Sequence, residues 1–161
     1  LFWLLVGGLP GILIYKAVNT ADSMIGHKNE RYREFGWASA RFDDLLNWIP
    51  ARLTALLVAG AAFFVRRADP EHSWRVALRD ARKHDSPNAG WPEAALAGAL
   101  GFQLGGPRAY AGEVHDLPSF GDGRADLSAL DILKSLELYW MAMNLLMALS
   151  LALGLVLWRF A

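Results

Sequence analysis

Charged side chains are segregated along this chain, and this segregation restricts its possible folds more than any other feature. They are nearly absent from the apolar runs 1–17, 53–65 and 138–158, whereas the segments between these runs are as polar as an ordinary enzyme surface. Hydrophobic residues make up 54% of the sequence, which is high for a small soluble domain. The pattern is typical of membrane helices. It predicts an all-α, multi-pass helical membrane protein with polar loops and short helices between the spans.

Two of the apolar runs have clear interpretations. Run 138–158 is long enough to cross a hydrocarbon core of about 30 Å, and Trp140 and Trp158 stand near its ends as interfacial anchors. Run 1–17 carries Gly8 and Pro10 among other small residues, which predicts an irregular or kinked helical span. The chain opens inside this run without a Met or a signal peptide, so we expect it to be a fragment of a longer polypeptide.

The middle run, 53–65, is too short for an ordinary membrane span. As a helix it would cover about 20 Å at 1.5 Å per residue. It predicts a short apolar helix that either crosses the bilayer with snorkelling arginines at its ends or returns to its own side. The choice decides whether the polar segments 18–52 and 66–137 share a compartment.

The second polar segment, 66–137, contains signals for two short helices. Asp69 followed by Pro70 is a helix start, and this helix should reach about His84. A second helix is predicted over 94–104, opened by Pro92 and Glu93 and ended by the Gly-Gly-Pro sequence 105–107. Residues 110–126 read as a loop.

Several function classes are excluded by composition. The formal net charge is zero, which argues against a nucleic-acid binder. This chain has no cysteine, so thiolate chemistry and cysteine-ligated metals are excluded within it, and no phosphate-loop motif is present. Histidines 27, 72 and 115 have no metal-ligand spacing and read as surface residues.

The first polar segment, 18–52, mixes aromatic residues with charges of both signs. On helical spacing, Trp37, Arg41, Asp44 and Trp48 share one face, which makes a plausible ligand surface. A solvated loop with surface ion pairs is the alternative, with Asp44 simply pairing with Arg41. The carboxylates of Asp22, Asp43 and Asp44 are suitable ligands for Mg²⁺.

A basic stripe follows in the second segment, formed by Arg75, Arg79, Arg82 and Lys83. Such a stripe can hold phosphate or carboxylate groups, or it can lie on anionic lipid headgroups. The Pro/Gly-containing turn 84–93 comes next and places a histidine, an amide and a carboxylate close together in sequence, as loop sites often do.

Three sequence motifs in these segments identify a protein family more specifically than the composition does. They are AVNTADSMIGHKNERY at 17–32, FGWASARFDDLLNWIPARLT at 35–54 and RDARKHDSPNAGWPEA at 79–94. Together they resemble the CobD/CbiB family of cobalamin biosynthesis, the adenosylcobinamide-phosphate synthases. The resemblance covers residues 1 to about 112, and the family is larger than this chain, so the chain looks like its C-terminal half.

The resemblance implies an inner-membrane enzyme that joins adenosylcobyric acid to an aminopropanol phosphate through an amide bond, using ATP and Mg²⁺, with its site on the cytoplasmic side. Expected partners are these substrates, the lipid bilayer, and a second copy or other cobalamin-assembly enzymes. The expected catalytic residues are Glu30, Arg31, Arg41, Asp44, His84 and Glu93. Substrate binding is expected at Asn29, Trp37, Trp48, Arg82, Lys83 and Asn88, and metal binding at Asp22 and Asp43.

Two other function classes were weighed against this enzyme. A non-catalytic membrane protein of the same ancestry, resembling the AmpE-type sensory proteins, would not need the Asp-Asp pair or the turn motif. A transporter would place charges within its spans, and the apolar runs here hold essentially none.

Overall fold

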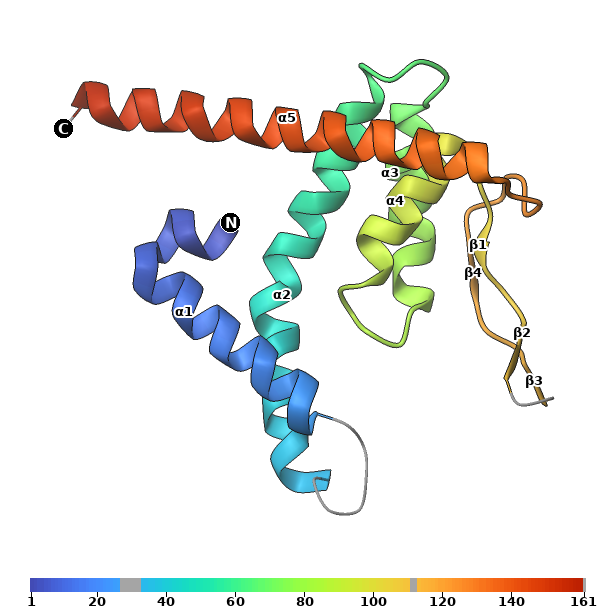
Figure 1. The fold of residues 1–161 in the computed structure, drawn as a ribbon, viewed down its shortest axis with the longest axis horizontal. Helices are drawn as coiled ribbons and strands as arrows, with labels where there is room; N and C mark the ends of the chain where they lie inside the picture. The colour runs from blue at the N-terminus through green and yellow to red at the C-terminus, as the bar shows by residue number, and fades with distance from the viewer. Residues whose placement is uncertain (27–32, 111–112, 161) are drawn as a thin grey trace. The chain divides into compact units, whose positions relative to one another are not determined.

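The computed structural model describes residues 1–26, 33–110 and 113–160, with side chains described for 1–26, 36–107 and 116–160. The chain divides into two compact units, Leu1–Pro50 and Ala51–Ala161. Helices account for most of both units, and the strands in the described part are two or three residues long, which confirms the all-α prediction (Figure 1).

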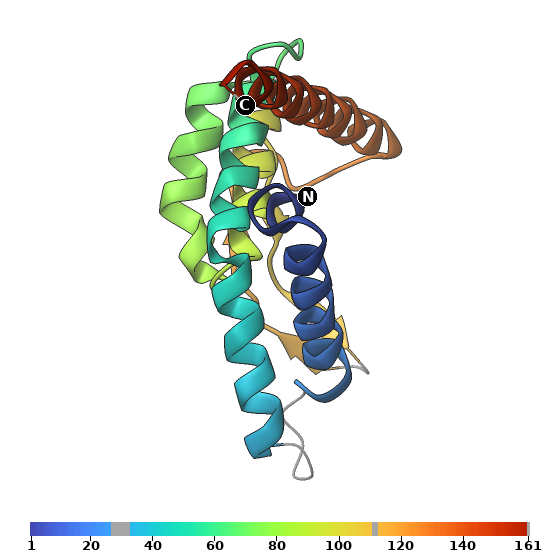
Figure 2. The same ribbon diagram turned by 90° about the vertical axis from the view of Figure 1, so that its left-hand side faces the viewer.

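The first unit pairs two helices. Helix α1, Phe2–Ile25, is kinked at Gly8, whose φ of 60° and ψ of −152° are open mainly to glycine. The predicted irregularity of this run is thus confirmed. Helix α2, Arg33–Ala62, begins in this unit and lies beside α1 (Figures 1 and 2). The indole N–H of Trp3 donates to the Leu46 carbonyl at 3.1 Å, which joins the two helices.

Helix α2 changes the interpretation of the apolar run 53–65. We expected a separate short helix, but 53–62 is the last part of a 30-residue helix that continues through Pro50. The change in hydropathy near Arg52 does not interrupt the backbone hydrogen bonds, because side-chain polarity alone does not end a helix. Most of the predicted polar segment 18–52 is likewise helical, since α1 extends to Ile25 and α2 begins at Arg33.

The second unit contains the two predicted short helices, with corrected ends. In α3, Pro70–Asp80, the Asp69 carboxylate accepts from the His72 N–H at 2.8 Å, so the predicted start is confirmed. The α-helix ends earlier than expected, and the turn η1, Ala81–Lys83, is a 3-10 helix. Helix α4, Gly90–Leu100, starts earlier and ends before Gly101, whose left-handed conformation stops it four residues short of our prediction.

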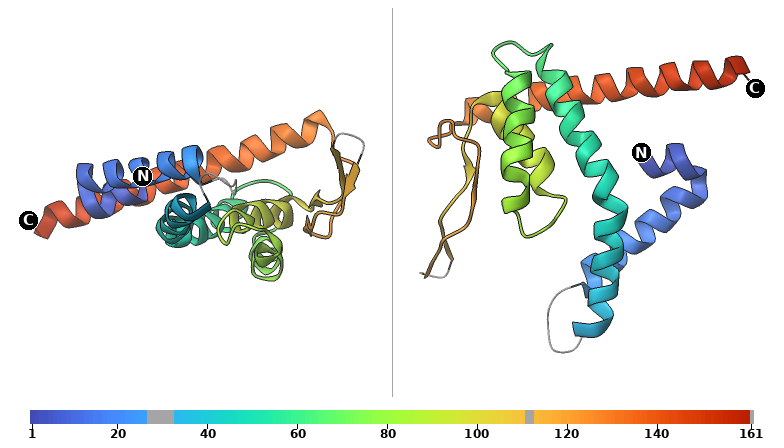
Figure 3. Two further views of the ribbon diagram at one scale, coloured as in Figure 1. Left: turned by 90° about the horizontal axis from the view of Figure 1, so that it is seen from below. Right: turned by 180° about the vertical axis from the view of Figure 1, so that it is seen from behind.

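Two short antiparallel ribbons extend into the stretch 110–126 that was expected to be loop. β1, Leu104–Gly105, pairs with β4, Ser119–Phe120, and β2, Arg108–Tyr110, pairs with β3, Glu113–His115. Figure 3 shows these ribbons as an extended arm beside α3 and α4. The first ribbon matters most for function, because it carries Phe120 to a position against α3 and α4.

The core of the second unit lies where α3, α4 and the last part of α2 meet the beginning of helix α5, Ala129–Phe160. Its buried residues are mostly alanines, with Val58, Val76 and Leu138 among the larger ones. Small side chains allow close helix approach. Ser73 is fully buried, and its hydroxyl donates to the Ala95 carbonyl at 2.8 Å, which ties α3 to α4.

Three helices in the described part of the chain are long and apolar enough to cross a membrane, spanning Phe2–Ile25, Gly36–Ala62 and Ala129–Phe160. Residues 151–160 of α5 are all exposed within this chain. Such an apolar surface needs lipid or other helices to cover it. The fold is therefore that of a multi-pass helical membrane protein, as predicted.

Candidate functional site

The turn between η1 and α4 holds His84 in a defined orientation. The ring nitrogen Nδ1 of His84 accepts a hydrogen bond from the Ser86 backbone N–H at 2.9 Å. The Ser86 hydroxyl in turn accepts from the N–H groups of Asn88 and Ala89, each at 3.3 Å. Because Nδ1 is an acceptor here, the neutral imidazole carries its proton on Nε2. His84 therefore offers an N–H donor on its other side.

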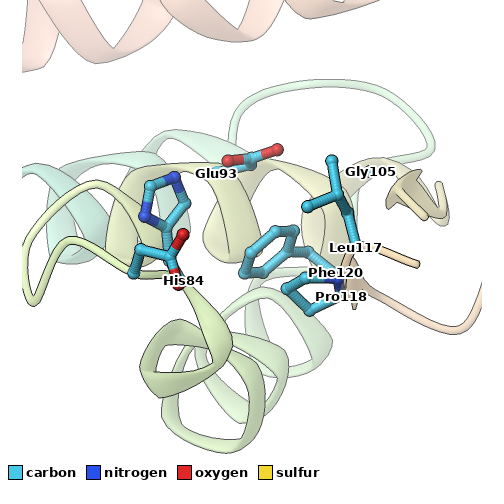
Figure 4. Close-up of a pocket in the computed structure, with 7 residues that line it drawn as sticks. His84, Glu93, Gly105, Leu117, Pro118 and Phe120 are labelled. Atoms are coloured by element: carbon cyan, nitrogen blue, oxygen red, sulfur yellow. The ribbon is translucent and has the colours of Figure 1, made fainter. Parts of the chain in front are cut away.

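A pocket of about 220 Å³ opens beside this turn. The rings of His84 and Phe120 are 5.9 Å apart and inclined at 33°, and Phe120 is 3% exposed. Figure 4 shows His84, Glu93 and Phe120 gathered around the pocket. The lining residues are His84, Asp85, Glu93, Gly105, Leu117, Pro118 and Phe120. Its charged members are thus both carboxylates, next to a neutral imidazole and an apolar wall.

A buried carboxylate, Asp80, fixes the wall that carries Phe120. Asp80 is fully buried and accepts from Arg79 Nε and Nη2 at 2.8 and 2.7 Å, forms an ion pair with Lys83 at 2.8 Å, and accepts from the Gly121 N–H at 2.8 Å. The hydrogen bonds from Arg79 hold the pKa of the Asp80 carboxyl far below its usual value. Asp80 thereby anchors the second strand of the first ribbon to α3.

Most of the predicted basic stripe is neutralised by carboxylates. Arg79 also pairs with Asp122 at 2.7 Å, and Arg75 pairs with Glu71 at 2.7 Å. Lys83, besides its ion pair with Asp80, donates to the Ser119 carbonyl at 3.3 Å. Arg82 is exposed and forms no ion pair within the part of the chain that the structure describes. Of the two stripe residues expected to bind substrate, Arg82 is the one whose charge is available.

Arg52 joins Arg82 in the second unit, and sequence reasoning missed it. Its guanidinium lies 4.7 Å from the centre of the Trp91 ring, and its Nη1 approaches Asn88 Oδ1 at 3.5 Å. Arg52 and Arg82 are near enough to repel each other. The sequence shows Arg52 only as the polar boundary of an apolar run, because its place directly before Leu53 gives no hint of a contact with Trp91. Two guanidiniums held together in this way favour an anion.

In the first unit, part of the predicted aromatic face is realised. The guanidinium of Arg41 lies 6.0 Å from the Trp37 ring, and its Nη1 is 4.0 Å from the Asp44 carboxylate. The structure therefore contains the Arg41–Asp44 pair that we considered as an alternative to a ligand-binding role. Trp37 and Trp48 are exposed, at 63% and 51%. This exposure leaves their rings accessible from outside the chain.

The carboxylates predicted to bind metal differ in their surroundings. Both oxygens of Asp43 accept hydrogen bonds, from the side-chain amides of Asn19 at 3.2 Å and Asn47 at 2.8 Å, and Tyr15 donates to Asn47 at 3.0 Å. This ladder links α1 to α2. Asp22 and Asp43 each lie close enough to Asp44 to repel its carboxylate. Among the described residues, no three His, Asp or Glu side chains form a metal-binding group.

This donor set fits a particular kind of Mg²⁺ site. Mg²⁺ usually takes one or two protein carboxylates and completes its shell with water and phosphate oxygens. Asp22 suits that arrangement better than Asp43, whose oxygens already accept amide hydrogens. Asp44 is the neighbouring carboxylate and pairs with Arg41 at 4.0 Å. The residues therefore fit a metal that arrives with a phosphate ligand, and do not form a closed protein cage.

The predicted site residues fall into two groups within the described part of the chain. Asp22, Trp37, Arg41, Asp43, Asp44 and Trp48 belong to the first unit, whereas Arg82, Lys83, His84, Asn88 and Glu93 belong to the second. Asn29, Glu30 and Arg31 lie outside the described residues. In the second unit the structure brings His84 and Glu93 to one pocket, and brings Arg52 to Asn88.

The fold and these polar sites define a helical membrane protein with a polar, pocket-bearing turn between its apolar helices. A family model described as CobD/Cbib protein matches residues 1–139, and the chain belongs to this family. It is 50% identical over 157 residues to the cobalamin biosynthesis protein CobD of Brucella anthropi, covering 96% of this chain and 48% of that protein. The corresponding protein of Rhodobacter capsulatus is 54% identical over 156 residues, 97% of this chain and 47% of its own length.

The chain thus spans about half the length of the curated relatives it matches. No solved structure matches it.

Proposed function

We propose that the full-length protein acts in cobalamin biosynthesis, as an ATP-dependent ligase that joins adenosylcobyric acid to aminopropanol phosphate and yields adenosylcobinamide phosphate. The family membership supports the pathway, since the relatives are named cobalamin biosynthesis proteins. The observation that carries the proposal is the turn 84–93, where His84 and Glu93 line a pocket and Arg52 contacts Asn88 and Trp91. A protein without a ligand has no need of such an arrangement.

The residue types suit the two demands of this reaction. Phosphate groups need cations, and Arg52 and Arg82 offer two guanidiniums on one side of the turn. The carboxyl group that forms the amide bond develops negative charge on its oxygen, and the Nε2–H of His84 is a donor suited to stabilise it.

ATP and Mg²⁺ fit the first unit. Asp22 and Asp44 would hold the metal, and Arg41 would approach the phosphates. When bound, ATP supplies the activation that a free carboxylate lacks as an acyl donor. Trp37 and Trp48 supply exposed aromatic surface for the corrin ring.

The proposed location follows from the same chemistry. We place the protein in the inner membrane with its active site facing the cytoplasm, where ATP is available. A second copy of the chain or another cobalamin-assembly enzyme is a candidate partner for the exposed apolar surface of α5.

The alternative is an AmpE-like sensory or scaffold protein without catalysis. Single substitutions His84→Ala and Asp44→Ala in the full-length protein discriminate the two, because an enzyme requires these groups and a scaffold does not. We expect adenosylcobinamide phosphate formation to fall by at least about a hundredfold in each variant while membrane insertion stays normal. The exposed Asp116→Ala is the control. Normal synthesis by both variants would exclude the proposed catalytic site.

A further inference from the structure

The pocket beside His84 has an electrostatic character opposite to that of the neighbouring arginine pair. Among the residues that the structure describes, the charged ones lining it are Asp85 and Glu93, both carboxylates. Of the basic residues just before the turn, Lys83 is held by Asp80 and the Ser119 carbonyl, and Arg79 by Asp80 and Asp122. Arg82 is exposed and is not among the described residues that line the pocket. A phosphate placed here would be repelled, whereas a cation would be attracted.

The shape and the walls of the pocket suit a small ligand. A volume of about 220 Å³ lies below the roughly 300–1,000 Å³ of pockets for drug-sized ligands, so it suits a small molecule or one end of a larger one. Leu117, Pro118 and Phe120 form an apolar side, and the face of an aromatic ring attracts a cation as well as a short alkyl group. Phe120 is fixed in place by the ribbon pairing of β4 with β1 and by its burial against Val76, Ala94 and Ala97.

Two fixed groups define the polar side. Glu93 stands in the first turn of α4, near the positive end of the helix dipole. His84 accepts the Ser86 N–H at Nδ1, so its neutral ring presents Nε2–H, which can donate but cannot accept a proton. An acceptor for N–H groups of a ligand is therefore available at Glu93 and Asp85, and a donor at His84.

We infer that this pocket is the subsite for the primary ammonium group of the amino-alcohol substrate, bound by the Glu93 and Asp85 carboxylates, and is not a phosphate subsite. The inference rests on the proposed function for its choice of substrate. In this arrangement the two ends of a zwitterionic amino-alcohol phosphate bind at different places. The ammonium end lies in the carboxylate pocket, and the phosphate end binds cations such as Arg82. Burial against Phe120 selects amines with short alkyl chains.

Binding of uncharged and charged probes to the full-length protein in nanodiscs tests this directly. We would measure the dissociation constants of 1-amino-2-propanol, 1,2-propanediol and propyl phosphate by calorimetry. The amine should bind at least about tenfold more tightly than the diol, and Glu93→Gln and Asp85→Asn should each remove most of that preference. Glu71→Gln is the matched control, a first-turn glutamate on α3 that pairs with Arg75 outside the pocket.

Turnover of the same variants separates this inference from the proposed function. Glu93→Gln should raise KM for the amino-alcohol phosphate at least about tenfold, with KM for ATP unchanged. If the wild-type protein makes adenosylcobinamide phosphate but binds the amine and the diol equally, or if Glu93→Gln leaves KM unchanged, the pocket assignment is wrong and the function stands. If the wild-type protein forms no product yet prefers the amine through Glu93, the pocket assignment holds and the proposed reaction fails.

Discussion

The carboxylate of Asp80 accepts a hydrogen bond from the backbone N–H of Gly121 at 2.8 Å, across 41 positions of sequence. The same carboxylate is fully buried and binds Arg79 and Lys83, both of which are about half exposed. This contact connects α3 to the strand that carries Phe120, so a residue outside the pocket determines the position of one of its walls.

Replacement of Asp80 should destabilise the second unit. Asp80→Ala leaves the Gly121 N–H without its acceptor and removes the shared partner of Arg79 and Lys83, which predicts a loss of about 2–4 kcal/mol in the free energy of unfolding. Denaturant unfolding followed by tryptophan fluorescence measures it. Asp116→Ala, at an exposed position, should change stability by less than about 0.5 kcal/mol. Equal stability of the two variants would show that the Asp80 network is dispensable.

The pH dependence of stability should reflect the same carboxylate. Hydrogen bonds from Arg79 lower the pKa of Asp80 in the folded protein below the 3.8 of an unperturbed group. Its contribution to stability is then complete above about pH 4–5 and is lost as pH falls toward the folded pKa. We expect the difference in melting temperature between wild type and Asp80→Asn to be constant from about pH 5 to 8 and to shrink below about pH 4. A difference that grows on acidification would contradict this.

The beginning of α5 should depend on a capping box that joins Ser128 and Asp131. The Asp131 carboxylate accepts from the Ser128 N–H and hydroxyl, each at 2.9 Å, and also binds Arg124 and Lys134. Asp131→Ala should fray the first turn of α5 and lower Tm by about 2–5 °C. Hydrogen exchange at 129–133 measures the fraying. If the amides of 129–133 in Asp131→Ala are as protected from exchange as in wild type, packing at Leu138 alone stabilises the beginning of α5.

The contacts of Arg52 with the turn 84–90 predict on which side of the membrane this turn lies. Because Arg52 contacts Asn88 and Trp91, the turn lies at the Arg52 end of the apolar run 53–65. Helix α3, which connects the other end of the run to the turn, is 11 residues long and charged, so it cannot cross a bilayer. Both ends of the run should therefore face one side.

Labelling of single cysteines tests this topology. Cysteines at Arg66 and Ser86, placed in a full-length protein without other cysteines, should react with a membrane-impermeant reagent from the same side. Reaction from opposite sides would mean that 53–65 crosses the bilayer and that the contact of Arg52 with Asn88 is not formed in the membrane.

The two carboxylates expected to bind metal should respond differently to substitution. If Asp22 holds Mg²⁺ as we propose, Asp22→Asn should raise the Mg²⁺ concentration needed for half-maximal activity, because one protein ligand is lost. Asp43→Asn should mainly lower thermal stability, because Asp43 links Asn19 of α1 to Asn47 of α2. Mg²⁺ titrations of activity and melting curves of both variants separate the two roles. A larger shift in Mg²⁺ requirement for Asp43→Asn would reverse the assignment.

Local signals in the sequence determined the membrane class and several helix boundaries. The segregation of charge predicted the long apolar helices, Asp69 with Pro70 predicted the start of α3, and Gly8 with Pro10 predicted the irregular first span. These features depend on residues within a few positions of each other, so they can be predicted from the sequence alone. Ser128 and Asp131 also had the capping-box spacing, and we overlooked it.

Only the tertiary structure decided which polar groups meet. The neutralisation of Arg79 and Lys83 depends on Asp80 and Asp122, and the role of Arg52 depends on Trp91, 39 positions further along the chain by residue number. The continuation of α2 through Pro50 and the end of α4 at Gly101 also contradicted the boundaries that hydropathy and glycine position suggested. A charge pattern shows which side chains can pair, but burial and long-range backbone hydrogen bonds select the partner, and these arise only when distant segments pack together.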